Sequence, residues 1–226
     1  FVDDLSNWYV RRSRRRFWKP VLSTVEGTEN DADKLAAYHT LYGCLVTLCK
    51  LMAPFTPFVA EEMYQNLVRS ADSEAPESVH LAEWPEADAS QVDGRLMDDM
   101  QLVMRVVSLG RAARSKAAIK VRQPLSRVSA FVATAAHAEG LRRQAGQVLE
   151  ELNVKELQVF ALIEAFKGPF ERPKDLLAML TPDDVLVEDD AGYAVAVNAS
   201  VTPGLAEEGL ARELVHRIQN LRRDAG

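Results

Sequence analysis

The spacing of apolar residues is helical through the first half of the sequence, and this pattern stops at Pro124. Before Pro124, apolar side chains recur every three or four positions, which is typical of amphipathic helices. The predicted helices cover about residues 3–18, 33–52, 56–68 and 92–119. After Pro124 the sequence contains short β-rich runs and further helices. The predicted strands and helices there are residues 126–134 (strand), 137–152 (helix), 154–160 (strand), 184–198 (a hairpin turning at 189–192) and a last helix after Thr202.

This pattern predicts a mainly α fold with two domains. Residues 1–124 are expected to form a helical bundle, and residues 125–226 a small α/β subdomain with a β-hairpin and a C-terminal helix. The helix at 33–52 is apolar on more than one face, so we expect it to be central. In the connector at 78–88, Leu81 and Trp84 are the expected anchors. The last helix is expected to turn its apolar side chains inward: Leu205, Leu210, Leu214, Ile218 and Leu221.

Composition places the chain among globular proteins. Of its 226 residues, 47% are hydrophobic, which is enough for a sizeable core. No run of 18 uncharged apolar residues occurs, so no membrane span is expected. Cys44 and Cys49 are five positions apart on different helix faces, which favours buried thiols in a reducing cytosol. The chain starts at Phe1 within a helical pattern, and we interpret it as part of a longer cytoplasmic protein.

Charge is distributed unevenly along the sequence. The net charge is -6, yet residues 1–20 carry six basic and two acidic side chains, and residues 105–127 carry seven basic and no acidic ones. Two basic segments thus lie in an acidic background, and local charge decides where a polyanion binds.

Nothing in the sequence predicts catalysis by this chain. It contains no phosphate-binding loop, no dinucleotide-binding glycine motif and no metalloprotease or nucleophile-elbow motif. The four histidines lie in four separate segments, and the adjacent carboxylates Glu61 and Glu62 suit a helix start. Two cysteines with no nearby histidine pair do not supply a zinc site. We therefore expect no catalytic residues, no metal and no cofactor in this chain.

The basic helix at the N-terminus favours nucleic-acid binding. Five of its six cations are arginines, whose planar guanidinium suits phosphates and base edges. Aromatic residues accompany them, and unpaired bases stack on such rings. In the competing interpretation the arginines only pair with acidic residues between 21 and 104, and the aromatics belong to the core. Of these aromatics, Trp18 is expected to be the most exposed.

Five segments, in order, resemble isoleucyl-tRNA synthetases, a family of class I aminoacyl-tRNA synthetases. The segments are "DDLSNWYVRRSRRRFW" (3–18), "LMAPFTPFVAEEMYQNL" (51–67), "SVHLAEWP" (78–85), "SLGRAARSKAAIKVRQPL" (108–125) and "EGLARELVHRIQNLRRDAG" (208–226). The blocks "APFTPFVAEE" and "HLAEWP" are similar in kind to the valyl and leucyl enzymes. The blocks "NWYVRRSRRRFW", "IKVRQPL" and "RIQNLRRDAG" favour the isoleucyl family. The resemblance implies the C-terminal anticodon-binding region.

The chain also departs from this family. The stretch 161–180 is shorter than expected, and a segment rich in Pro, Asn and Gly is absent between Phe160 and Phe170, through deletion or because a disordered stretch is passed over. The catalytic and editing domains are absent, so the resemblance implies a fragment that cannot activate isoleucine.

What the resemblance implies is recognition of the anticodon stem-loop of an isoleucine-accepting tRNA. The complete enzyme would use ATP with Mg²⁺, with zinc possible outside this fragment, and the other partners would be the catalytic and editing domains of the same chain. The expected tRNA-binding residues are Arg11, Arg12, Arg14, Arg15, Arg16, Trp18, Lys19, Arg111, Arg114, Lys116, Lys120, Arg122, Arg217, Arg222 and Arg223. Two alternatives stay open: the equivalent domain of a valyl- or leucyl-tRNA synthetase, and a helical protein-binding scaffold.

Overall fold

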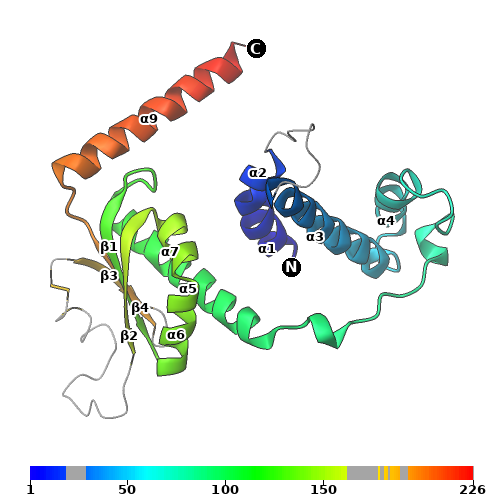
Figure 1. The fold of residues 1–226 in the computed structure, drawn as a ribbon, viewed down its shortest axis with the longest axis horizontal. Helices are drawn as coiled ribbons and strands as arrows, with labels where there is room; N and C mark the ends of the chain where they lie inside the picture. The colour runs from blue at the N-terminus through cyan, green and yellow to red at the C-terminus, as the bar shows by residue number, and fades with distance from the viewer. Residues whose placement is uncertain (19–28, 162–177, 179–180, 183, 189–192, 226) are drawn as a thin grey trace. The chain divides into compact units, whose positions relative to one another are not determined.

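The computed structural model describes residues 1–18, 29–161, 178, 181–182, 184–188 and 193–225 (Figure 1). Contacts divide the chain into two compact units, residues 1–89 and 90–226. The first unit is helical, and the second contains a four-stranded sheet and helices. The predicted fold class, a helical domain followed by a small α/β subdomain, is confirmed.

The first unit is built from three long helical segments. The first comprises α1 (Val2–Asp4), a π-helical stretch η1 (Leu5–Val10) and α2 (Arg11–Phe17), which follow one another without a break. The second is α3 (Glu29–Met52), and the third is α4 (Pro57–Tyr64), continued by η2 (Gln65–Arg69). All three helices were predicted from spacing. Pro57 occupies the first turn of α4 as expected, because a proline there sacrifices no helical hydrogen bond.

The core of the first unit lies where α3 and α4 meet. Cys49, Ala60 and Tyr64 are buried together, and Val79 of the short helix η3 (Val79–Leu81) packs on them. Glu61 fixes this connector, because its carboxylate accepts hydrogen bonds from the Ser78 hydroxyl at 2.8 Å and the Val79 amide at 3.0 Å. The connector is therefore anchored by Val79. The expected anchors Leu81 and Trp84 are wrong, since their side chains are 69% and 60% exposed.

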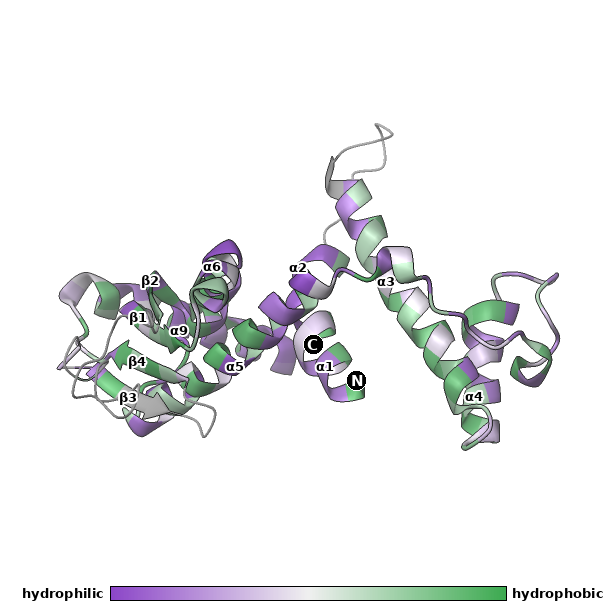
Figure 2. Ribbon diagram, turned by 90° about the horizontal axis from the view of Figure 1, so that it is seen from below, coloured by the Kyte–Doolittle hydropathy of each residue, from purple (hydrophilic) through white to green (hydrophobic). Residues whose placement is uncertain are grey.

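The helix α3 is apolar over much of its surface but is not enclosed. Leu35, Tyr38 and Tyr42 are exposed, so the expectation of a central helix is not met in the described residues. Figure 2 shows the apolar residues along α3. Residues 31–52 have the length and mean hydropathy (1.2) of a membrane span, with 11% of the window buried. Core helices of soluble proteins share this length and hydropathy.

The short helix η4 (Ala89–Gln91) spans the division between the units, and the second unit continues with the long helix α5 (Gly94–Lys116), which the Asp93 side chain caps. The remaining elements are β1 (Leu125–Val132), α6 (Ala135–Arg143), α7 (Ala145–Leu152), β2 (Val154–Ala161), β3 (Asp184–Glu188), β4 (Ala194–Asn198) and α9 (Pro203–Asp224). The single predicted helix at 137–152 is thus two helices, which meet at Gln144.

The strands form one mixed sheet in the order β2-β1-β4-β3. Strands β1 and β2 are parallel and are joined through α6 and α7, whereas β4 runs antiparallel to both β1 and β3. Strands β3 and β4 are the predicted hairpin, and its predicted turn at 189–192 lies outside the described residues. Helices α5, α6 and α7 lie on one side of the sheet (Figure 1), with α5 against β3 and β4.

The packing of α5 belongs to the sheet unit. Val103, Val107 and Gly110 are buried, and a Cβ on Gly110 would lie 2.4 Å from a methyl of Leu152 in α7. A side chain at position 110 would therefore force Leu152 to shift, and glycine permits the observed approach of the two helices. The contacts divide the chain between Ala89 and Ser90, which places α5 in the sheet unit. The boundary that the sequence predicts, at residue 124, stays a prediction.

The last helix, α9, begins at the predicted cap, where the Thr202 hydroxyl accepts from the Leu205 amide. Its predicted inward face is wrong in the described residues. Leu210 is 72% exposed and Leu221 69%, and Leu214 and Ile218 are exposed as well. Polar contacts hold the helix instead: Lys155 pairs with Glu208, and Arg212 donates to the Asn153 side chain.

Candidate nucleic-acid interface

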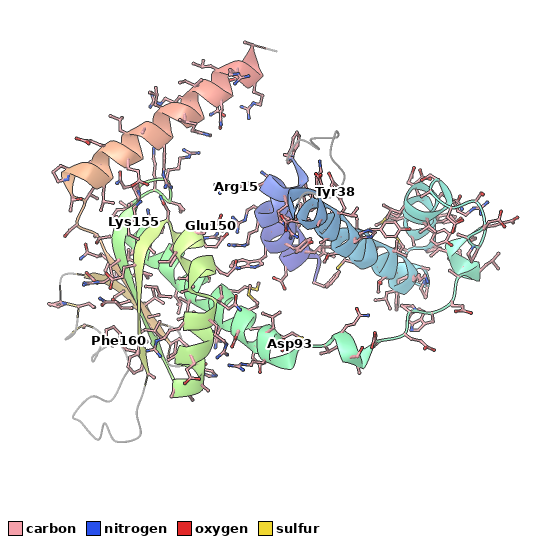
Figure 3. All side chains as sticks on the ribbon, in the orientation of Figure 1. Arg15, Tyr38, Asp93, Glu150, Lys155 and Phe160 are labelled. Carbon is pink, nitrogen blue, oxygen red and sulfur yellow. The ribbon has the colours of Figure 1, made fainter. Side chains whose placement is uncertain are left out.

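The arginines of α2 fall into two groups. Arg14 and Arg15 are exposed, and Figure 3 labels Arg15. Arg16 is held by α3, because its Nε and Nη2 donate to the side chain and carbonyl of Asp33 at 2.9 and 3.0 Å. Arg11 donates to the Asn7 carbonyl at 2.8 Å in its own helix. Exposed Arg14 and Arg15 are therefore the side chains best placed to meet a polyanion.

The aromatic residues of this helix also divide. The Tyr9 hydroxyl donates to the Ala37 carbonyl at 3.0 Å, and the Phe17 ring packs on Tyr38 with centroids 4.9 Å apart. Tyr9 in η1 and Phe17 in α2 therefore fix the first helical segment on α3. Trp8 is half-buried beneath the Arg12 guanidinium, which lies 5.4 Å from the ring centroid. Trp18 is 84% exposed, as expected, and it ends the helix next to the arginines.

In the second basic segment, Arg114 is a structural residue, and its expected role as a tRNA contact is wrong. It is 1% exposed. Its Nη1 donates to the Leu152 carbonyl at 3.1 Å, and its Nη2 donates to the carbonyls of Lys120 and Gln123. Burial lowers the pKa of the Arg114 guanidinium to about 10, which still leaves it charged at neutral pH. The side chain ties the end of α5 and the following loop to α7.

The burial of Arg114 follows from how α5 ends. Ala118 has a φ of 56°, and the amides of Ala118 and Ile119 donate back to the carbonyls of Ser115 and Arg114. This is the left-handed Schellman ending of a helix, which turns the chain back on itself. The loop at 120–123 is thereby brought over Arg114. Arg111, one turn earlier, is partly exposed and pairs with the buried Glu151 at 2.5 Å.

A groove brings together cations from two parts of the sequence. Lys120 and Arg122 follow α5, Arg217 belongs to α9, and all three line a cavity of about 360 Å³ with Glu213 between them. Glu213 pairs with Arg122 at 3.3 Å and with Arg217 at 3.7 Å. Burial alone would raise the pKa of Glu213, but the Arg122 hydrogen bond and the nearby cations lower it. Three cations against one carboxylate leave the groove positive.

Arg122 has a second partner that the sequence did not suggest. Its Nη2 lies 2.9 Å from Nε2 of His216, and the Asn220 amide nitrogen lies 3.0 Å from the same atom. Both of these groups donate, so Nε2 of His216 is the acceptor in this arrangement. His216 and Glu213 therefore position Arg122. The only signal of this cluster in the sequence was the four-residue spacing from Glu213 to Arg217 and from His216 to Asn220.

The remaining residues that the sequence predicts as tRNA contacts lie outside the two groups described above. Lys116 and Arg222 are exposed, Arg223 is exposed beside Asp224 at 3.3 Å, and Lys19 lies outside the described residues. The basic helix α2 and the groove residues belong to different units, so their predicted convergence on one surface stays a prediction. In the part of the chain that the structure describes, no group of three or more His, Cys, Asp or Glu residues could hold a metal ion.

Comparison with known families identifies the domain that carries this candidate interface. The family described as the anticodon-binding domain of tRNA ligase matches residues 1–129, more than half of the sequence. The chain belongs to this family.

Curated relatives that match the chain over its whole length include isoleucine–tRNA ligases of several bacteria. Those of Dehalococcoides mccartyi, Thermus thermophilus and Streptomyces avermitilis are 53%, 41% and 37% identical to it. Each alignment covers 100% of this chain and 20%, 26% and 25% of the relative, respectively. The chain thus spans a fifth to a quarter of the length of these relatives.

The alignment lengths bear on the predicted short segment. The Dehalococcoides relative aligns over 226 residues, whereas the Thermus relative aligns over 277. The Thermus protein therefore has about 50 positions without a counterpart in this chain, and the Dehalococcoides protein shares the shorter length. The stretch predicted to be short, 161–180, lies almost entirely outside the described residues.

Proposed function

We propose that this chain is the tRNA-binding portion of an isoleucine–tRNA ligase and that it contacts the anticodon stem-loop. The observation that carries the proposal is the exposed end of α2, where Arg14, Arg15 and Trp18 stand together in a domain of the anticodon-binding family. Arginines on a rigid helix hold phosphates, which position the RNA, and an exposed ring stacks on an unpaired base.

The groove of the second unit provides a further phosphate contact in this proposal. Three cations converge there from the loop after α5 and from α9: Lys120, Arg122 and Arg217. Randomly distributed surface charges would not be expected to gather in this way. Isoleucine activation with ATP and Mg²⁺, and editing, are assigned to other parts of a longer cytoplasmic protein. No catalytic step is assigned to this chain.

Exposed apolar surface supports contacts with those other protein parts. Phe55 is 83% exposed and Phe58 89%, and Val59 in the first turn of α4 is also exposed. Contiguous exposed apolar side chains of this size mark surfaces that another protein surface covers. We propose the catalytic and editing domains of the same polypeptide as the partners. Protein binding by a helical scaffold, the second alternative from the sequence, would then be part of this function.

Binding to tRNA transcripts with isoleucine and valine anticodons tests the function. The expected result is preference for the isoleucine transcript and a log Kd that varies steeply with log salt, by about 0.7–0.9 per phosphate contact. The double variant Arg14→Glu/Arg15→Glu should weaken binding of both transcripts and reduce the slope. Lys50→Glu/Arg142→Glu makes the same change in net charge at positions outside α2 and serves as the matched control. Equal affinity of the wild type and the Arg14/Arg15 variant would remove α2 from the interface.

A further inference from the structure

A larger cavity lies in the sheet unit, away from the groove. It has a volume of about 960 Å³ and is lined by the first half of α5, by α6 and by Tyr193, which precedes β4. Asp93, the cap of α5, is labelled in Figure 3 and marks the helix end from which this cavity begins. The volume is that of a small-molecule site. Neither the expected interface nor the proposed phosphate contacts include it.

One wall of the cavity is rigid. Nε and Nη2 of Arg143 donate to the two carboxylate oxygens of Asp99 at 2.9 and 2.8 Å, and Asp99 is 8% exposed. A Cβ on Gly140 would lie 2.3 Å from Oδ1 of Asp99, so α6 presses its backbone against this pair. A bidentate pair in this position fixes α6 on α5.

Another wall is a stack of planar groups. The Arg105 guanidinium carbon lies 4.8 Å from the Tyr193 ring centroid. The His137 ring lies 5.9 Å from the same ring, tilted by 36°, and its Nδ1 is 3.2 Å from the Tyr193 hydroxyl. Three planar groups from α5, α6 and the start of β4 therefore meet at one cavity. Unpaired bases stack on aromatic rings and guanidinium planes of this kind.

The charges of the lining select against a phosphate. Three arginines line the cavity, and three carboxylates oppose them: Arg95, Arg105, Arg143, Asp98, Asp99 and Glu139. A net positive field of the kind found in the groove is therefore absent from these residues. Carboxylates that face a cavity accept hydrogen bonds, and the exocyclic amino groups of bases donate them.

We propose that this cavity takes one unstacked, amino-bearing nucleobase of a single-stranded RNA segment. The base stacks on the Arg105–Tyr193 pair, and its amino group donates to Asp98 or Glu139. Guanine, cytosine and adenine fit this arrangement, whereas uracil offers no amino group. The inference rests on the proposed function for the identity of the RNA, but the base-binding step is measurable without tRNA.

The experiment has two arms on the whole chain. In the first, GMP, CMP and UMP are titrated while NMR follows the ring signals of His137 and Tyr193. Saturable shifts with GMP or CMP that are weaker with UMP and lost in Arg105→Gln are expected. The absence of saturable shifts with all three nucleotides, or shifts that persist unchanged in Arg105→Gln, would overturn the proposal. Arg105 is exposed on α5, so this variant is expected to fold.

In the second arm, the Kd for the isoleucine-accepting transcript is measured. Tyr193→Ala should weaken binding by about 5- to 100-fold. The salt slope should stay unchanged, because the variant loses a stacking contact with a base but no contact with a phosphate. Tyr193→Phe, which keeps the ring, should bind within about 3-fold of the wild type. Unchanged affinity of Tyr193→Ala would refute the cavity's role while the wild type still binds tRNA. Failure of the wild type to bind would instead remove the proposed function, and the nucleotide titration would still decide the cavity.

Discussion

Replacing Arg114 with methionine separates a structural role from an RNA contact. Methionine replaces the buried, unbranched stem of Arg114 with an unbranched apolar side chain. It removes the guanidinium and with it all three hydrogen bonds to carbonyls. The carbonyls of Leu152, Lys120 and Gln123 then lose their partner. The loop after α5 loses its attachment to α7 as a consequence.

The magnitude follows from the surroundings of each carbonyl. The Leu152 bond is buried, so its acceptor cannot rebond to water and should cost about 1–3 kcal/mol. The Lys120 and Gln123 bonds are partly exposed, and each should contribute about 0.5–1 kcal/mol. The sum is about 2–5 kcal/mol of unfolding free energy, and we take the lower middle of this range, about 3 kcal/mol. For a unit the size of residues 90–226 this corresponds to a decrease in Tm of roughly 10 °C.

Thermal and urea unfolding followed by circular dichroism measure this loss. Lys116→Met, two positions further on and exposed, is the matched control and should lower the Tm far less, because contacts of an exposed lysine contribute little to stability. RNA binding well below the melting transition completes the comparison, since Arg114→Met should leave the salt slope unchanged. A variant that melts like the wild type and loses one phosphate contact in the slope would show that Arg114 faces solvent, and the structural assignment would be wrong.

Three further substitutions test other features. Gly110→Ala should destabilise the sheet unit by about 1–2 kcal/mol, because overpacking against Leu152 exceeds the gain in helix propensity, whereas Gly146→Ala has open space and should not destabilise it; urea midpoints compare them. Ala118→Gly should raise the urea midpoint by the equivalent of about 0.5–1 kcal/mol, because glycine adopts a φ of 56° without strain. Hydrogen bonds from Gln65 and Ser78 lower the pKa of Glu61 below 4.5 in the folded state, so its stabilisation is present above pH 4.5 and lost as pH falls through the folded pKa. The stability difference between wild type and Glu61→Gln should accordingly shrink on acidification, and a difference that grows would contradict this.

The sequence predicted the elements well because their signals are local. Spacing located the first helix, α3, α4 and α5, and the β-rich runs located the strands of the sheet. Thr202 and Pro203 placed the start of α9 correctly, since a cap depends on the residues beside it.

Partners of these elements were predicted less well. The apolar face of α9 was assigned to a core, yet Leu210 and Leu221 are exposed, because periodicity defines a face and not what covers it. The same limit applies to α3.

Arg114 shows a signal that charge counting obscured. It lies seven residues after Val107 and eleven after Val103, on the same face of α5 as these buried valines. Weighing its position on the helix above its charge would have placed it inside. Glu151, in contrast, is far from Arg111 in the sequence, so no local pattern could have predicted that ion pair.

The position of Glu213 between Arg122 and Arg217 has a consequence for selectivity. Both guanidinium groups already pair with this carboxylate, so a phosphate bound in the groove would compete with it. We expect a dilute simple anion to gain little from that exchange. A polynucleotide presents many phosphates at a high local concentration, so we expect the groove to favour it over a simple anion.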